Sequence, residues 1–221
     1  MKKNSKYDLF IFDFDGTLAD SRLNIINSLN FALNTQGLSP IEGKRITPLI
    51  GKMSLDNTFL YFYPELKTVQ IEKLLEEFRI YQREHAHEEL VFFPEVLSTL
   101  EKLYKQKKML AILTTKHISQ ITYILKLFKI DHFFDVVLGE GVISQRKPAS
   151  ECVGYILSSL SVPLDKSKVV MIGDSSVDVL SAQNGGIDMI AVGHGTDSLE
   201  SLKEMGAIFT VNTFSEILQY T

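Results

Sequence analysis

The stretch Leu9-Phe10-Ile11-Phe12-Asp13-Phe14-Asp15-Gly16-Thr17-Leu18 runs from an apolar segment directly into two acids. An apolar run without polar alternation predicts a strand that is buried on both faces, as in a parallel sheet. Because side chains alternate along a strand, Asp13 and Asp15 are expected to point to one side and Phe14 to the other. Open α/β sheets bind ligands at the carboxyl ends of their strands. The two acids are therefore candidate functional residues, and the apolar run before them argues against a solvated surface turn.

Further apolar runs follow along the chain and alternate with segments of helical spacing. One such segment has Val96, Leu100 and Leu103 on one side. Alternation of strands and helices predicts an α/β fold with a doubly wound parallel sheet, a Rossmann-like core. The later strands are expected at Met109–Leu113, Val136–Leu138, Val169–Ile172, Met189–Val192 and Ile208–Val211.

The interval between the first two strands is too long for a single crossover helix. It carries helical patterns of its own, and we expect a small all-helical cap domain at residues 20–89. Residues 1–19 and 90–221 then form the α/β core domain. The two connections, near Asp20 and near Leu90-Val91, are the expected hinges.

Composition and charge exclude several classes of protein. The chain has 221 residues, and its 23 Lys and Arg against 27 Asp and Glu leave a net charge of −4, which argues against a protein that coats nucleic acid or an anionic membrane. No apolar stretch reaches the length of a membrane span. The single cysteine, Cys152, cannot form an intramolecular disulfide. We expect a cytoplasmic protein that is a monomer or a weak homodimer.

Polar side chains follow other predicted strands too. Thr114-Thr115-Lys116 ends the second strand, and Lys147-Pro148 lies in the loop after the third. The fourth strand runs into Gly173-Asp174, with Asp178 one helical turn later. Taken singly, a threonine at a strand end or a lysine in a loop is weak evidence for a site.

Taken together, these residues indicate one site. The first and fourth strands of such a sheet are often neighbours, which would gather the four acids. Two like charges at about 4 Å repel by roughly 4 kcal/mol at an effective dielectric of 20, so the cluster needs a cation. All-oxygen ligands suit Mg²⁺, and a lysine and a threonine complete a cradle for phosphate. The set therefore predicts phosphoryl transfer. The sequence has no Walker-type glycine-rich loop, so a nucleotide cofactor is not implied.

The order Asp13-Phe14-Asp15-Gly16-Thr17, Thr114, Lys147-Pro148 and Gly173-Asp174 with Asp178 resembles the haloacid dehalogenase superfamily. The match spans the whole chain, and the helical insertion is similar to that family's cap of the first type. Leu18-Ala19-Asp20-Ser21 and the cap pattern ending in Ile50-Gly51 resemble the phosphoglycolate phosphatase-like branch. Thr115 departs from that branch, which often has Asn there.

The resemblance implies roles for the motif residues. Asp13 would attack phosphorus and form an aspartyl phosphate, and Asp15 would act as general acid and then base. The Asp13 carboxylate, the Asp15 backbone carbonyl and Asp174 would hold Mg²⁺. Asp178 would bind it through water or orient Lys147.

The phosphate and the rest of the substrate would be held by other residues. Thr114, Thr115 and Lys147 are the expected phosphate-binding residues. In the cap, Arg45 and Lys52, next to Gly51, could bind a second anion of the substrate or could equally form a solvated face. The cap would close over the site and exclude water.

The leading hypothesis is a Mg²⁺-dependent phosphatase for a small phosphorylated metabolite, with phosphoglycolate as the first guess. A sugar-phosphate phosphomutase or a pyrophosphatase would use the same nucleophile and metal site. A receiver-like phospho-acceptor module also uses acids, Thr and Lys around Mg²⁺, but it has no cap and places its phosphorylated Asp on the third strand. A catalytically idle binding protein would have little reason to keep the full site.

Overall fold

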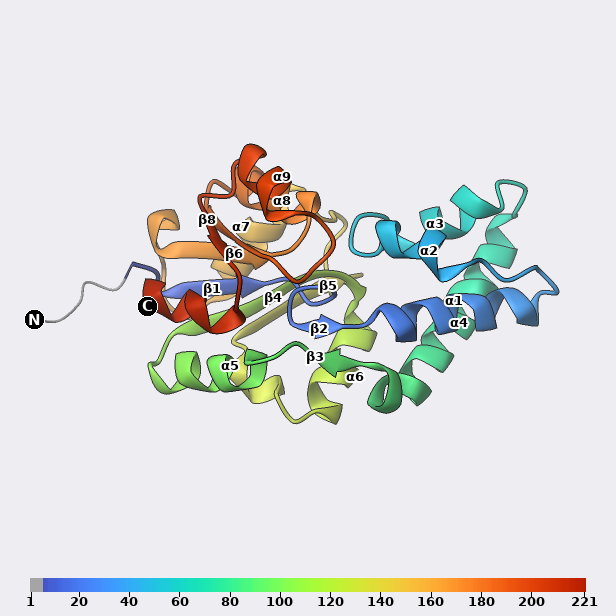
Figure 1. Cartoon of the computed structure of the whole chain (residues 1–221), viewed down its shortest axis with the longest axis horizontal. Coiled ribbons are helices and arrows are strands. Elements are labelled where there is room, and N and C mark those ends of the chain that lie inside the picture. Colours follow the sequence, from blue (N-terminus) through green and yellow to red (C-terminus); the bar gives the residue numbers. More distant parts are fainter. Residues whose placement is uncertain (1–5) are drawn as a thin grey trace, which may run out of the picture.

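A six-stranded parallel sheet forms the centre of the α/β core (Figure 1). The computed structural model describes residues 6–221, so the first five residues of the segment assigned to the core lie outside the described part. Each apolar run found in the sequence is a strand of this sheet. In spatial order the strands are β5 (Val136–Glu140), β4 (Met109–His117), β1 (Leu9–Phe12), β6 (Val169–Gly173), β7 (Asp188–Val192) and β8 (Phe209–Val211).

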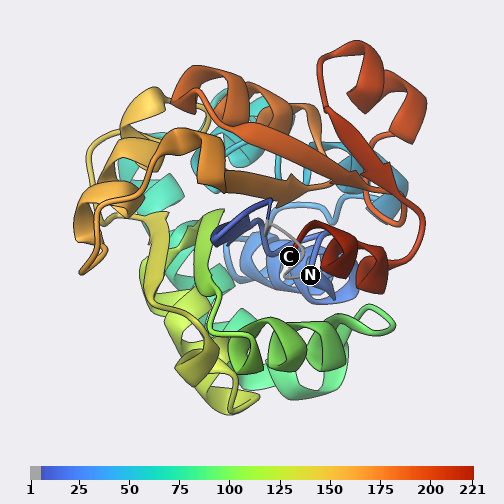
Figure 2. The ribbon, with the colours of Figure 1, turned by 90° about the vertical axis from the view of Figure 1, so that its left-hand side faces the viewer.

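Helices cover both faces of the sheet, as Figure 2 shows in a view along the longest axis of the molecule. Phe10 and Phe12 pack on α5 (Val96–Lys105), α6 (Ile118–Leu127) and the 3-10 helix η4 (Phe214–Tyr220). Leu9 and Ile11 pack on the other layer. That layer consists of α7 (Ser150–Ser159), α8 (Ser176–Gly185) and α9 (Leu199–Glu204). The doubly wound architecture predicted from the sequence is confirmed.

The second predicted strand is β4, whose apolar run ends at Leu113. The strand continues through Thr114, Thr115 and Lys116, where the sequence analysis placed its end, to His117. Pairing with β5 shifts register after Leu113 and resumes between His117 and Glu140. The polar residues are therefore part of the sheet, because hydrogen bonding to β5 continues past the apolar run. Two short 3-10 helices, η2 (Asp131–Phe133) and η3 (Lys166–Lys168), complete the core.

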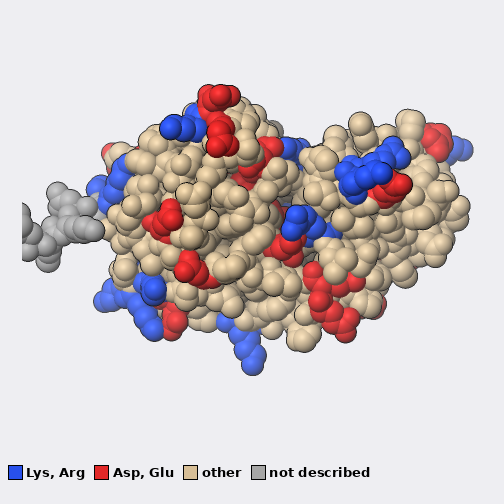
Figure 3. Space-filling model, viewed as in Figure 1, with Lys and Arg blue, Asp and Glu red and all other residues tan. Residues whose placement is uncertain are grey.

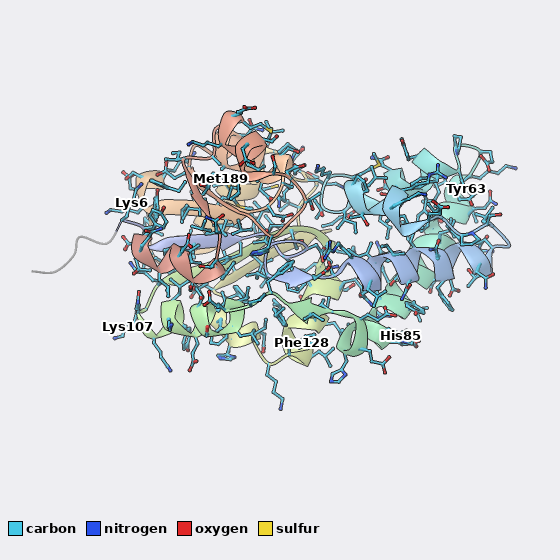
Figure 4. All side chains as sticks on the ribbon, in the orientation of Figure 1. Lys6, Tyr63, His85, Lys107, Phe128 and Met189 are labelled. Carbon is cyan, nitrogen blue, oxygen red and sulfur yellow. The ribbon has the colours of Figure 1, made fainter. Side chains whose placement is uncertain are left out.

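The helical segments between β1 and α5 form a second lobe with a hydrophobic core of its own (Figure 1). Leu29, Leu33, Phe59, Leu74 and Phe78 lie at its centre. In Figure 4, Tyr63 lies at the far end of this lobe and Met189 lies in the α/β core. The segments are α1 (Arg22–Thr35), α2 (Gly43–Ile46), the 3-10 helix η1 (Thr47–Leu49), α3 (Leu55–Phe62) and α4 (Thr68–Glu89).

A two-stranded antiparallel ribbon, absent from the sequence analysis, joins the two lobes. It pairs β2 (Ala19–Asp20) with β3 (Val91–Phe92). The domain boundaries at residues 20 and 89 fall beside this ribbon, and so do the two expected hinges. Within residues 6–221, no helix is both long enough and apolar enough to cross a lipid bilayer.

Candidate active site

Three buried carboxylates meet at the carboxyl ends of β1 and β6. The two strands are hydrogen-bonded neighbours in register, and the Asp13 amide extends the pairing by donating to the Ile172 carbonyl at 2.9 Å. Asp13 and Asp174 therefore leave the sheet side by side, and Asp178 joins them from the first turn of α8. One carboxylate oxygen from each of the three lies within 4.8 Å of the other two.

Lys147 enters this cluster from the loop between β5 and α7. Its side chain is almost fully buried, and its ammonium donates to Asp13 Oδ1 at 3.0 Å and to Asp178 Oδ1 at 2.5 Å. A third hydrogen bond reaches the Leu113 carbonyl at 3.2 Å. All three protons of the ammonium therefore take part in hydrogen bonds, and the two carboxylates fix the position of the Lys147 side chain.

The remaining carboxylate oxygens are held by hydrogen bonds. Asp174 accepts from the Thr17 hydroxyl at 2.7 Å and from the Thr196 amide at 2.8 Å. Asp178 Oδ2 accepts from the amides of Asp174 and Ser175 and from the Ser175 hydroxyl. One oxygen of Asp178 therefore contacts Lys147 and the other contacts the start of α8. These contacts agree with the role in orienting Lys147.

Gly16 is needed where this site turns. Its φ is +86°, and a Cβ atom there would overlap the Asp174 carboxylate. A positive φ is strained for residues with a side chain, whereas glycine adopts it readily. The turn after Asp15 can therefore lie in direct contact with the acidic cluster.

The charges of the cluster do not balance. Burial, followed by repulsion from Asp178, raises the pKa of Asp174 to about 6. Burial also raises the pKa of Asp13, against the opposing effect of Lys147. Burial disfavours the charged form of Lys147, but Asp13 and Asp178 outweigh it and raise its pKa. Three carboxylates and one ammonium leave an excess of two negative charges, and carboxylate oxygens are ligands that Mg²⁺ accepts. The residues therefore fit a divalent metal ion.

Asp15 lies in a different environment. Its carboxylate accepts from the Ser21 hydroxyl at 2.5 Å and pairs with the Lys116 ammonium at 3.1 Å. The Asp15 side chain is thus not part of the carboxylate cluster, which joins three of the four acids that the sequence analysis expected to gather; the metal-binding group predicted for Asp15 is its backbone carbonyl. The Lys116 side chain is only 5% exposed. The sequence analysis placed Lys116 at the end of the second strand and gave its side chain no role.

The two threonines lie where β4 passes the site. Thr114 is buried, and its hydroxyl accepts from the Lys116 amide at 3.2 Å. Both threonines line a pocket together with Lys147, and Thr115 also lines the cavity next to Asp15. The structure therefore places Thr114, Thr115 and Lys147 around one space.

The cap residues separate into two groups. Gly51 lines the cavity next to Asp15, and Lys52 crosses to the core and pairs with Asp197 at 2.6 Å. Arg45 is exposed and lies over the Phe62 ring at 5.0 Å instead of lining this cavity. Its side chain packs on its own lobe, so it does not join the other two residues.

A second ion pair also joins the lobes, between Arg146 of the core and Asp56 of α3 at 3.3 Å. The space-filling view shows acidic and basic side chains near the hollow where the lobes meet (Figure 3). With Lys52 and Asp197, this pair holds the cap against the carboxyl edge of the sheet.

Comparisons with known proteins agree with this architecture. The sequence model of the haloacid dehalogenase-like hydrolases matches residues 10–192. Pyrophosphatase PpaX of Bacillus cereus (strain Q1) is 30% identical over 214 residues, which cover 96% of this chain and 95% of the relative. A predicted phosphoglycolate phosphatase from Haemophilus somnus superposes with a TM-score of 0.86 at 25% identity, covering 98% of both chains. A haloacid dehalogenase-like family hydrolase from Streptococcus pneumoniae gives 0.80 at 25% identity, covering 97% of this chain and 98% of its own.

Proposed function

Because the chain belongs to the haloacid dehalogenase-like hydrolase family and has the features of its phosphatases, we propose that it hydrolyses a small phosphomonoester through an aspartyl phosphate on Asp13. The observation that carries this proposal is the buried cluster of Asp13, Asp174 and Asp178 with Lys147 between two of its members. An arrangement with this excess of negative charge costs stability unless it serves a cation and a phosphoryl group.

The reaction divides into two transfers. An Asp13 carboxylate oxygen attacks phosphorus, and the bond from phosphorus to the leaving oxygen breaks. Asp15 supplies a proton to that oxygen and then removes one from the water that hydrolyses the intermediate. Ser21 and Lys116 hold the Asp15 carboxylate in place for both steps. Lys147, Thr114 and Thr115 would bind the phosphoryl oxygens.

Asp13 and Asp174, with the Asp15 backbone carbonyl, are the residues that would hold Mg²⁺. When bound, the ion would neutralise charge on the phosphoryl group. Asp178 would keep Lys147 directed at Asp13, because its Oδ1 accepts a hydrogen bond from the Lys147 ammonium while its Oδ2 accepts from the amides of Asp174 and Ser175.

The test is phosphate release from para-nitrophenyl phosphate, measured with Mg²⁺ and with EDTA. We expect release with Mg²⁺, little with EDTA, and none from Asp13→Asn in either condition. Asp131→Asn, a change of the same kind at an exposed position, is the control and should behave as wild type. Release by Asp13→Asn at the wild-type rate would rule out the nucleophile.

Pyrophosphate is a second candidate substrate. It is favoured by the names of the Bacillus relatives, which are pyrophosphatases. The chemistry at phosphorus would be the same, and the difference would lie in the leaving group, which is a phosphate in one case and an alcohol in the other. Assaying both classes of substrate with one preparation separates the two candidates.

A further inference from the structure

A cavity between the cap and the core lies directly next to Asp15, the proposed proton donor to the leaving oxygen. It is lined by residues of α1, α2, η1 and the loop after it, α3, α4, β4, α6 and β5. If Asp15 protonates the leaving group, that group must occupy this cavity. The chemistry of its walls therefore describes the substrate, an inference that rests on the proposed function.

The walls are mostly apolar. Side chains from the cap supply most of this surface, and they include Ile25, Leu29, Ile46, Ile50, Met53 and Phe78. Contact between an apolar wall and apolar surface of a ligand favours binding. A charged ligand in the same place would lose its water without gaining a polar partner, which disfavours binding. The body of the leaving group should therefore be apolar.

The charged residues that line the cavity are two acids, Asp15 and Glu140, and two cations, Lys116 and Arg79, so their formal charges cancel. Asp15 is paired with Lys116 at 3.1 Å, and Glu140 interacts with Arg79 and is paired with Arg146, from outside the cavity lining, at 2.8 Å. Burial, followed by the charge of Arg79, lowers the pKa of His117 and favours its neutral form. Little positive charge is left to neutralise the second phosphate of pyrophosphate.

Two buried amides point to a ligand. Gln82 of α4 is 1% exposed, and neither its Nε2 nor its Oε1 has a hydrogen-bond partner among residues 6–221. Gln120 of α6 is equally buried; its Nε2 donates to the Arg79 carbonyl at 2.8 Å, while its Oε1 has no partner in that range. Both residues line the cavity. A buried amide without partners is costly, so its presence calls for a bound group that can both donate and accept.

We infer that the leaving group of the substrate is an uncharged organic group, with an apolar body and a donor–acceptor edge that pairs with Gln82. A carboxamide has such an edge, since it offers one acceptor and two donors. Gln82 is then the residue that selects the leaving group.

Four substrates test this inference with the full-length enzyme and Mg²⁺. They are phenyl phosphate, para-carbamoylphenyl phosphate, phosphoglycolate and inorganic pyrophosphate. The carbamoyl compound should show a higher kcat/KM than phosphoglycolate or inorganic pyrophosphate, whose leaving groups are charged. Its kcat/KM relative to phenyl phosphate should fall about tenfold in Gln82→Leu, because one buried hydrogen-bonding contact is lost. Comparing this ratio between the wild type and the variant cancels the different reactivity of the two phenols.

The matched control is Gln106→Leu, the same substitution at an exposed position after α5, in which the ratio should not change. A second readout needs no substrate. Gln82→Leu should raise the Tm of the free enzyme by about 2–4 °C, because it removes an unpartnered buried amide. A lower Tm would mean that the amide pairs within the fold, for example with the Oδ1 of Asn24, and would overturn the inference.

Three results of the substrate series would also overturn it. One is an unchanged ratio in Gln82→Leu, and another is a higher kcat/KM for phosphoglycolate or pyrophosphate than for the carbamoyl compound. Either would leave the proposed phosphatase chemistry standing. If none of the four substrates released phosphate, the proposed function would fail, and the inference would fail with it.

Discussion

Replacing Asp13 by Asn should stop the reaction and, in the absence of metal, stabilise the protein. Asp13 lies within 4.8 Å of carboxylate oxygens of both Asp174 and Asp178. Each repulsion is worth about 3.5 kcal/mol at that distance and an effective dielectric of 20. The attraction to Lys147 at 3.0 Å is worth about 5.5 kcal/mol on the same scale. The two repulsions therefore exceed the attraction by about 1–2 kcal/mol, and burial of the charge adds to this cost.

Thermal unfolding in EDTA and in saturating Mg²⁺ measures this effect. In EDTA, Asp13→Asn should melt about 2–8 °C above wild type. In Mg²⁺ the difference should shrink or reverse, because the wild-type carboxylate binds the ion better than a neutral amide does. A variant that loses activity and also melts below wild type in EDTA would refute the reasoning, since Asp13 would then be holding the fold together.

Three further predictions use other residues of the site. Lys147→Ala should lower kcat about a hundredfold or more in steady-state assays, as expected for loss of a group that stabilises transferring charge, and a change confined to KM would mean that Lys147 only binds. Because the pKa of Asp174 is raised to about 6 from an ordinary 3.8, its contribution to the stability of metal-free protein is fully present below about pH 4 and is lost as the pH rises through about 6. Mg²⁺ should therefore raise Tm more near pH 7.5 than near pH 5, and equal increments would contradict this sign. Burial raises the pKa of the Cys152 thiol, which is 2% exposed, so an aromatic disulfide reagent near pH 8 should label it only as urea unfolds the chain, and rapid labelling of native protein would contradict the packing.

The central part of the site was predictable because it depends on local features. Asp13 and Asp174 each follow a strand that is apolar on both faces, and strands of that kind lie in the interior of a parallel sheet. Their carboxyl ends therefore share one edge, and the neighbouring positions of β1 and β6 bring the two acids together. Asp178 follows Asp174 by four residues and lies in the first turn of α8, which is also a local property.

Lys116 and Gln82 were not predictable in the same way. Lys116 looks like the end of a strand, and its ion pair with Asp15 depends on pairing between β4 and β5 continuing past Leu113. Gln82 looks like an ordinary polar position on an amphipathic helix. Its burial depends on how the cap packs at the carboxyl edge of the sheet, which no local pattern encodes. The same packing leaves Arg45 outside the cavity.

The amino-acid order was sufficient to establish the α/β class, the family and the acids that meet at the sheet edge, since periodicity and strand termini act over a few residues. The chemistry of the leaving-group cavity came from the packing of two lobes on each other. Its walls combine residues far apart in the chain, such as Gln82 and Glu140, so their burial and charge balance exist only in the folded molecule.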